Sequence, residues 1–93
     1  MGRYRIETTL EADQHLLAYK KAGNRIAIER IERIFVELEE HPETGIGKPK
    51  KLKHKYSGYW SREIDKKNRM RYIIEENIVT VTVVSAMGHY DDK

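Results

Sequence analysis

Hydrophobic positions in the first half of the chain recur with a helical period. Between Ile26 and about Glu40 the apolar residues return at steps of three and four, which predicts an amphipathic helix that ends before Pro42. A narrower apolar face around Leu16 predicts an earlier helix that runs to about Lys21. Together these two segments predict a helical hairpin over about residues 9–41.

Residues suited to helix ends support the same hairpin. Thr8, followed three residues later by Glu11, matches a capping box at the start of the first helix. Gly23 suits the left-handed position after a helix, and Asn24 can cap the next one. The turn between the two helices is therefore predicted at Gly23-Asn24.

The second half of the chain changes to a period of two. The pattern predicts three strands there, and a similar short pattern predicts one strand before the hairpin. In chain order the four are Arg3–Thr8, Tyr59–Ile64, Arg69–Glu75 and Ile78–Ala86. A glycine-bearing loop over residues 43–58 separates the helices from the later strands. The predicted fold class is α+β in one domain over residues 1–93, in which an antiparallel meander over residues 59–90 packs against the helices.

The alternation is clearest in the segment Arg69–Glu75. Met70, Tyr72 and Ile74 fall in one phase, while Arg69 and Arg71 fall in the other. One face of the sheet is therefore expected to pack on the helices. The opposite face is expected to carry arginines.

Charge is unevenly distributed along the chain. Residues 48–71 hold ten Lys or Arg against two acidic residues, whereas the other segments together hold eight basic and thirteen acidic residues. Such a block favours a surface that binds a polyanion, and the alternative is an ordinary solvated lysine-rich loop. The candidate RNA-binding residues are Lys48, Lys51, Lys53, His54, Arg62 and Arg71.

Composition excludes several other classes of protein. The chain has no cysteine, so neither a disulfide framework nor a zinc finger is expected. It also lacks an apolar run of the roughly 20 residues that a membrane helix needs. Its four histidines are scattered, so no metal or other cofactor is expected. We therefore expect a cytoplasmic protein without a membrane partner.

The remaining polar residues suit cleavage of RNA without a metal. RNA carries its own nucleophile, the 2′-hydroxyl, so cleavage needs a base, cations for the phosphate and an acid for the leaving oxygen. Arginine suits the phosphate because its planar fork can hold two oxygens. Tyr56, Tyr59 and Tyr90 could stack on unpaired bases, whereas Trp60 is better explained as a core residue.

Short motifs in the second half resemble one known family. The runs GKPKKLKH (residues 47–54) and SGYWSR (residues 57–62) resemble the pattern GKPEPLKH…SGFWSRRI of YoeB-type toxins, which belong to the RelE/ParE toxin superfamily. NRMRY (residues 68–72) is similar to the family's HRLVY strand, and the final His89-Tyr90 is similar to its closing HY. Four motifs thus occur in the family's order over about residues 45–90.

This resemblance implies a RelE-like, microbial RNase-like fold and a ribosome-dependent mRNA endoribonuclease. Such a toxin cuts at the codon in the A site of the small ribosomal subunit and leaves a 2′,3′-cyclic phosphate. It implies a type II toxin–antitoxin pair, whose cognate antitoxin would be YefM/Phd-like, acidic and partly disordered. The toxin could also form a homodimer.

Roles carried over by the resemblance fall on particular residues. Arg69 matches the arginine that stabilises the phosphate, His89 the general acid and Tyr90 the neighbouring tyrosine of the site. Lys53 and Arg62 match basic positions expected to contact RNA.

Two positions depart from the family pattern. Lys50 stands where the pattern has its glutamate, the proposed general base, and Glu63 replaces the second arginine of SRR. Lys50 is therefore a candidate either for the base or for a cation that holds the phosphate.

Two rival functions share these features. A toxin of the ParE kind, which poisons DNA gyrase without cutting nucleic acid, could have the same fold but would not need His89 and Tyr90. A plain RNA-binding module would need only the basic half of the chain.

Overall fold

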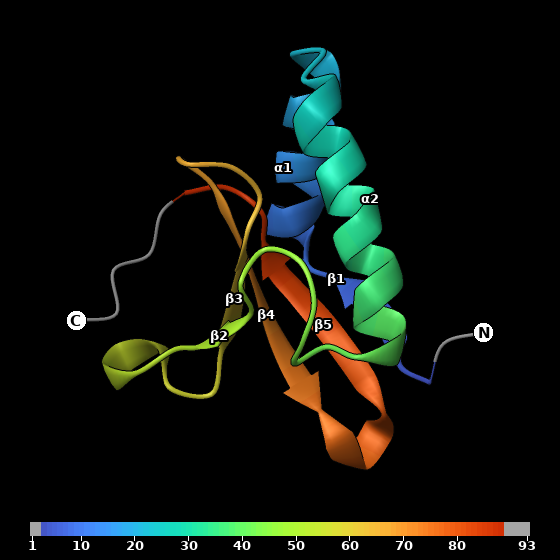
Figure 1. The fold of residues 1–93 in the computed structure, drawn as a ribbon, viewed down its shortest axis with the longest axis vertical. Coiled ribbons are helices and arrows are strands. Elements are labelled where there is room, and N and C mark those ends of the chain that lie inside the picture. Colours follow the sequence, from blue (N-terminus) through green and yellow to red (C-terminus); the bar gives the residue numbers. More distant parts are fainter. Residues whose placement is uncertain (1–2, 89–93) are drawn as a thin grey trace.

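The structure, a computed structural model, describes residues 3–88 of the chain. Its two helices, α1 (Leu10–Lys21) and α2 (Arg25–Glu40), form the predicted hairpin and lie side by side (Figure 1). Gly23 takes a left-handed backbone at φ +67°, and the side chain of Asn24 accepts a hydrogen bond from the Ala27 N–H at 3.2 Å. Both predicted turn residues are confirmed. In the described part of the chain, no helix is both long and apolar enough to span a membrane.

The predicted cap of α1 is wrong by one residue. Thr9 is the N-cap, and its hydroxyl oxygen accepts from the Ala12 N–H at 3.1 Å. Thr8 belongs to the preceding strand, and its hydroxyl donates to Asp13 at 2.6 Å. Two adjacent threonines give the same local pattern, and the length of the strand decides which of them caps the helix.

Within residues 3–88, five strands form one mixed sheet in the order β1-β5-β4-β3-β2. The predicted antiparallel meander is confirmed as β3 (Trp60–Glu63), β4 (Arg69–Glu75) and β5 (Thr80–Ser85). The first strand, β1 (Arg5–Thr8), is shorter than predicted and pairs in parallel with β5. A strand that the sequence did not predict, β2 (Lys50–Lys51), pairs antiparallel with β3 at the opposite edge.

Short 3₁₀ turns occupy two of the connections. One covers His54–Tyr56, and the other, Glu76–Ile78, replaces the expected start of the last strand at Ile78. Val79 then adopts a left-handed backbone at φ +48°, which is rare for a β-branched residue. Strand β5 therefore begins only at Thr80.

The apolar face of the sheet packs against the helices, as the alternation predicted. Met70 and Tyr72 of β4 are fully buried in one cluster with Ile34 and Leu38 of α2. Trp60 is partly buried and packs against this cluster, in agreement with its assignment to the core. The helices thus cover one face, and the other face of β2–β4 remains outside this core.

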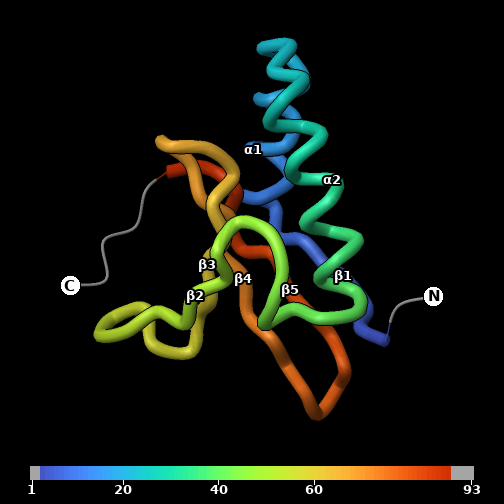
Figure 2. Tube along the Cα trace, in the orientation of Figure 1, coloured from blue at the N-terminus to red at the C-terminus, as the bar shows by residue number. Residues whose placement is uncertain are grey.

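The segment between α2 and β3 carries most of the predicted basic loop. From the end of α2 the chain arches toward β3 and runs into β2 before it turns back (Figure 2). The carbonyl of Gly47 accepts from the Glu63 N–H at 2.7 Å. Gly47 has φ +80°, and a Cβ there would lie 2.8 Å from the Glu63 carbonyl oxygen. Only glycine lets the loop approach β3 this closely.

Candidate nucleic-acid interface

The face of the sheet opposite the helices gathers polar residues from four strands. Cross-strand register places Lys50 opposite Ser61, Ser61 opposite Arg71, and Glu63 opposite Arg69. Ser85 of β5 is opposite Arg71 at an irregularity in the β4–β5 ladder. We call this set the open face: Lys50, Ser61, Glu63, Arg69, Arg71 and Ser85. Ser61 and Ser85 are themselves buried, so the accessible side chains of the set are the charged ones.

Arg69 and Glu63 form an ion pair at one end of the open face. Arg69 Nη1 lies 3.0 Å from Glu63 Oε2, and the two side chains are 23 % and 33 % exposed, respectively. The hydrogen bond from Arg69 lowers the pKa of Glu63 below its usual value, and the positive charges of Arg69, Lys48 and Arg30 add to this effect against the opposing effect of burial. Glu63 is therefore a carboxylate at neutral pH.

Arg71 lies between two tyrosine rings. Its guanidinium carbon is 5.0 Å from the ring centroid of Tyr56 and 4.9 Å from that of Tyr59. The rings meet edge to face with their centroids 6.4 Å apart, and the Lys55 ammonium lies 5.4 Å from the Tyr56 ring. Cation–π contacts of this kind hold a guanidinium in place. Both tyrosines therefore join the site, as side chains that position Arg71.

The predicted RNA-binding lysines are exposed but do not all lie on one face. Lys48 and Lys53 are exposed, as are His54 and the candidate catalytic residue Lys50. Lys51 is exposed too, but it pairs with Trp60. Because successive side chains of a strand point to opposite faces, Lys51 lies on the other side of the sheet from Lys50. The structure thus separates Lys51 from the open face.

The structure contradicts the prediction that Arg62 contacts RNA. Its side chain is fully buried, because Arg62 pairs with Met70 and so belongs to the helix side of β3. It forms an ion pair with Glu37 of α2 and donates through Nε to the Tyr72 hydroxyl at 3.1 Å. Its guanidinium also donates to the carbonyl oxygens of His41, Thr44 and Ile46. Arg62 is a structural residue that ties the loop after α2 to the core.

Sequence reasoning missed the partner of Arg62. Glu37 is 20 % exposed and accepts hydrogen bonds from Arg62 and from the Ile46 N–H. Burial acts to raise the pKa of Glu37, but these hydrogen bonds and the Arg62 charge outweigh it, so the pKa lies below its usual value. A signal for the correct face existed: a period of two places Arg62 in the same phase as Trp60, which was assigned to the core.

The end of the described chain lies beside Arg69. The Arg69 N–H donates to the Gly88 carbonyl at 2.9 Å, and the Gly88 N–H donates to Asn68 Oδ1 at 3.1 Å. His89 and Tyr90, the predicted acid and its neighbour, lie outside the described residues. His89 follows Gly88 directly in the sequence.

Comparison with known proteins identifies the family. A family model described as a YoeB-like toxin of bacterial type II toxin–antitoxin systems matches residues 9–90. The chain belongs to this family. A curated YoeB toxin from Mycobacterium bovis and the toxin RelK from Mycobacterium tuberculosis are each 41% identical over 69 residues, covering 74% of this chain and 79% of the relative.

Solved structures of YoeB toxins have the same fold. A YoeB/ParE toxin from Agrobacterium tumefaciens superimposes with a TM-score of 0.85 at 27% identity, covering 92% of this chain and 99% of the other. A YoeB dimer from Staphylococcus aureus gives a TM-score of 0.82 at 25% identity, covering 95% and 99%. The predicted RelE-like α+β fold is confirmed. The match over residues 9–90 includes the whole open face of this YoeB-family toxin, together with His89 and Tyr90.

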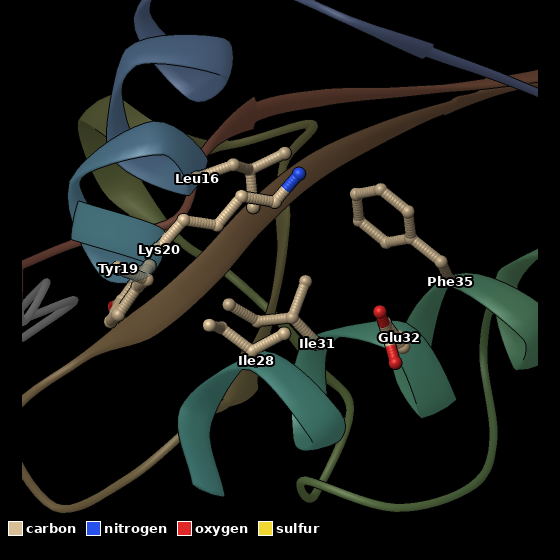
Figure 3. Close-up of a pocket in the computed structure, with 7 residues that line it drawn as sticks. All are labelled: Leu16, Tyr19, Lys20, Ile28, Ile31, Glu32 and Phe35. Carbon is tan, nitrogen blue, oxygen red and sulfur yellow. The ribbon is translucent and has the colours of Figure 1, made fainter. Parts of the chain in front are cut away.

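A second surface feature of this toxin lies between its helices. A hollow of about 150 Å³ is lined by Leu16, Tyr19, Lys20, Ile28, Ile31, Glu32 and Phe35 (Figure 3). Its walls are mainly apolar, and all of its lining residues come from α1 and α2. It is a seam of the hairpin and contains none of the open-face residues.

Proposed function

We propose that this toxin is a ribosome-dependent endoribonuclease that cuts mRNA at the A-site codon by metal-free transesterification. The observation that carries the proposal is the position of Arg69 on the open face, on the same strand as Arg71, one strand from Glu63 and two strands from Lys50. A phosphodiester on this face would meet several cations at once. Family membership supports the same reading.

The reaction uses the RNA as its own nucleophile. A base removes the proton of the 2′-hydroxyl, the 2′-oxygen bonds to phosphorus, and the bond from phosphorus to the 5′-oxygen breaks. The products are a 2′,3′-cyclic phosphate and a 5′-hydroxyl. Arg69 holds the non-bridging oxygens and stabilises the charge that develops on them. His89 donates the proton to the leaving oxygen, with Tyr90 beside it in the sequence.

The other cations bind the RNA chain. Arg71, held between Tyr56 and Tyr59, presents a fixed positive charge on the same strand as Arg69. Lys48, Lys53 and His54 are exposed in and around the loop and add contacts to RNA or to the ribosome. Lys50 serves either as the base or as a further cation for the phosphate.

An antitoxin is the proposed regulatory partner. Two solved structures from Staphylococcus aureus are complexes of YoeB with YefM. The matched chains in these complexes are 26% and 27% identical to this chain. We propose a YefM-like antitoxin whose acidic, partly disordered segment folds over the basic surface and excludes RNA. The YoeB dimer of Staphylococcus aureus supports a homodimer here as well.

Mapping of RNA ends tests the proposed activity. Purified toxin added to ribosomes programmed with a defined mRNA should give new 5′ ends at the A-site codon, and naked RNA should be cut little. The ribosome orients the substrate, and such orientation supplies much of the rate. His89→Gln should lower the single-turnover rate by roughly 10²–10⁴, the usual contribution of a general acid. Intact mRNA together with inhibited gyrase would instead establish a toxin of the ParE kind.

A further inference from the structure

The proposed reaction needs a proton acceptor, and few groups on the open face suit that role. A lysine must lose its charge before it can accept a proton, whereas a carboxylate is ready to accept one at neutral pH. In the described part of β2–β5, two carboxylates lie on the side of the sheet that carries Arg69: Glu63 and Glu75. Glu75 is six residues along β4 from Arg69, about 20 Å in an extended strand, and it accepts a hydrogen bond from Thr82.

Glu63 is close enough to Arg69 for both to contact one phosphodiester. The two residues are directly opposite across the β3–β4 ladder, and Glu63 Oε2 lies 3.0 Å from Arg69 Nη1. A guanidinium has five N–H donors arranged in a fork, more than one carboxylate oxygen can accept from. A phosphate oxygen bound to the same fork would place the adjacent ribose within reach of Glu63.

We propose that Glu63 is the general base that takes the proton of the 2′-hydroxyl, an assignment that rests on the proposed ribonuclease activity. The proton moves from the 2′-oxygen to a Glu63 carboxylate oxygen as the bond from that 2′-oxygen to phosphorus forms. The bond to the 5′-oxygen breaks, and the acid supplies a proton to that oxygen. The carboxylic acid form of Glu63 then returns its proton to solvent.

The surroundings of Glu63 change in the direction that this role requires. In the free protein Arg69, Lys48 and Arg30 all hold the pKa of Glu63 down, which keeps it ionised but makes it a weak base. A bound phosphate would share the Arg69 charge and would place a second anion beside the carboxylate. Both effects raise the affinity of Glu63 for a proton once the substrate is in place.

The same geometry gives Lys50 a separate role. Lys50 pairs with Ser61, two residues before Glu63 on β3, so it lies in the row of Arg71, and Glu63 lies in the row of Arg69. An exposed ammonium there suits a phosphate oxygen. Lys50 and Glu63 are the two positions that depart from the family pattern. They thus lie on one face of the sheet, in neighbouring rows of cross-strand pairs.

Single-turnover cleavage on programmed ribosomes tests the assignment. Glu63→Gln keeps the size of the side chain and an oxygen that can accept from Arg69, but it cannot take a proton at neutral pH. We expect the rate at saturating toxin to fall roughly 10²–10⁴-fold, the range for a general base, with little change in the Kd for ribosomes. Glu75→Gln is the matched control on the same face and should leave the rate unchanged. Lys50→Arg keeps a cation for the phosphate and should lower the rate far less than Glu63→Gln does.

A pH series separates a base from a structural counter-ion. The wild-type rate should fall in acid as Glu63 becomes protonated, and Glu63→Gln should lose this acidic limb altogether. A Glu63→Gln variant that cleaves as fast as wild type, or faster, would overturn the proposal and leave Glu63 as a partner that merely restrains Arg69. A wild-type protein that does not cut ribosome-bound mRNA would overturn the ribonuclease activity and this assignment together, so the two failures are distinguishable.

Discussion

The two faces of the sheet use the same kind of residue for opposite purposes. On the helix side, the guanidinium of Arg62 is fully buried, and its ion pair and hydrogen bonds tie the loop after α2 to Glu37 and Tyr72. On the open face, Arg69 forms an ion pair with a carboxylate that is itself one third exposed. Buried cations need a complete set of partners, whereas a cation that must bind substrate has to remain reachable. The face on which an arginine lies therefore decides whether it serves the fold or the site.

Removal of the buried arginine should have the largest effect. Arg62→Ala leaves Glu37 without its cation and removes one donor from each of three carbonyls, so we expect unfolding to become easier by about 3–5 kcal/mol. Urea denaturation followed by circular dichroism measures this loss. Arg62→Lys should rescue little of it, because an ammonium cannot reproduce the fork. A stable Arg62→Ala protein that fails only to bind RNA would restore the original prediction of a contact residue.

Removal of the open-face arginine should separate activity from stability. Arg69→Ala should lower the single-turnover cleavage rate by roughly 10²–10³, as for loss of one donor to a transition state. Its free energy of unfolding should change by less than about 1 kcal/mol, because the lost ion pair with Glu63 is partly exposed. Arg69→Lys should recover part of the rate. Thermal melting of the same samples is the control, and a fall in activity that tracks a fall in stability would contradict the contrast.

Lowering the pH should reduce the free energy of unfolding by a smaller amount, and the loss should differ between the two faces. The pKa values of Glu37 and Glu63 both lie below the usual 4.5, so each carboxylate stabilises the fold above that pH and loses this contribution as pH falls through its folded pKa. Urea denaturation of Glu37→Gln and Glu63→Gln across a pH series should show a shallower acid loss than wild type. Added salt should reduce the Glu63 contribution more than that of the less exposed Glu37. Equal sensitivity to salt would show that burial does not distinguish the two pairs.

Local patterns in the sequence were sufficient for much of the architecture. Gly23 and Asn24 marked the hairpin turn, and the alternation of Met70 and Tyr72 with Arg69 identified a strand and its two faces. The cap of α1 was misplaced because Thr8 and Thr9 offer the same hydroxyl, and only the parallel pairing of β1 with β5 extends the strand through Thr8. Two-residue β2 carries too few positions to show a period at all.

The sequence by itself determined the helical hairpin, the meander and the concentration of positive charge before and within it. These depend on the spacing of neighbouring residues, which is fixed along the chain. Tertiary structure alone decided that Arg62 is buried against Glu37, that Lys50 and Lys51 lie on opposite sides of the sheet, and that Glu63 meets Arg69. Each of these outcomes depends on strand register and on contacts between residues far apart in the chain. A one-residue change in register would reverse every face, so composition and charge alone could not assign them.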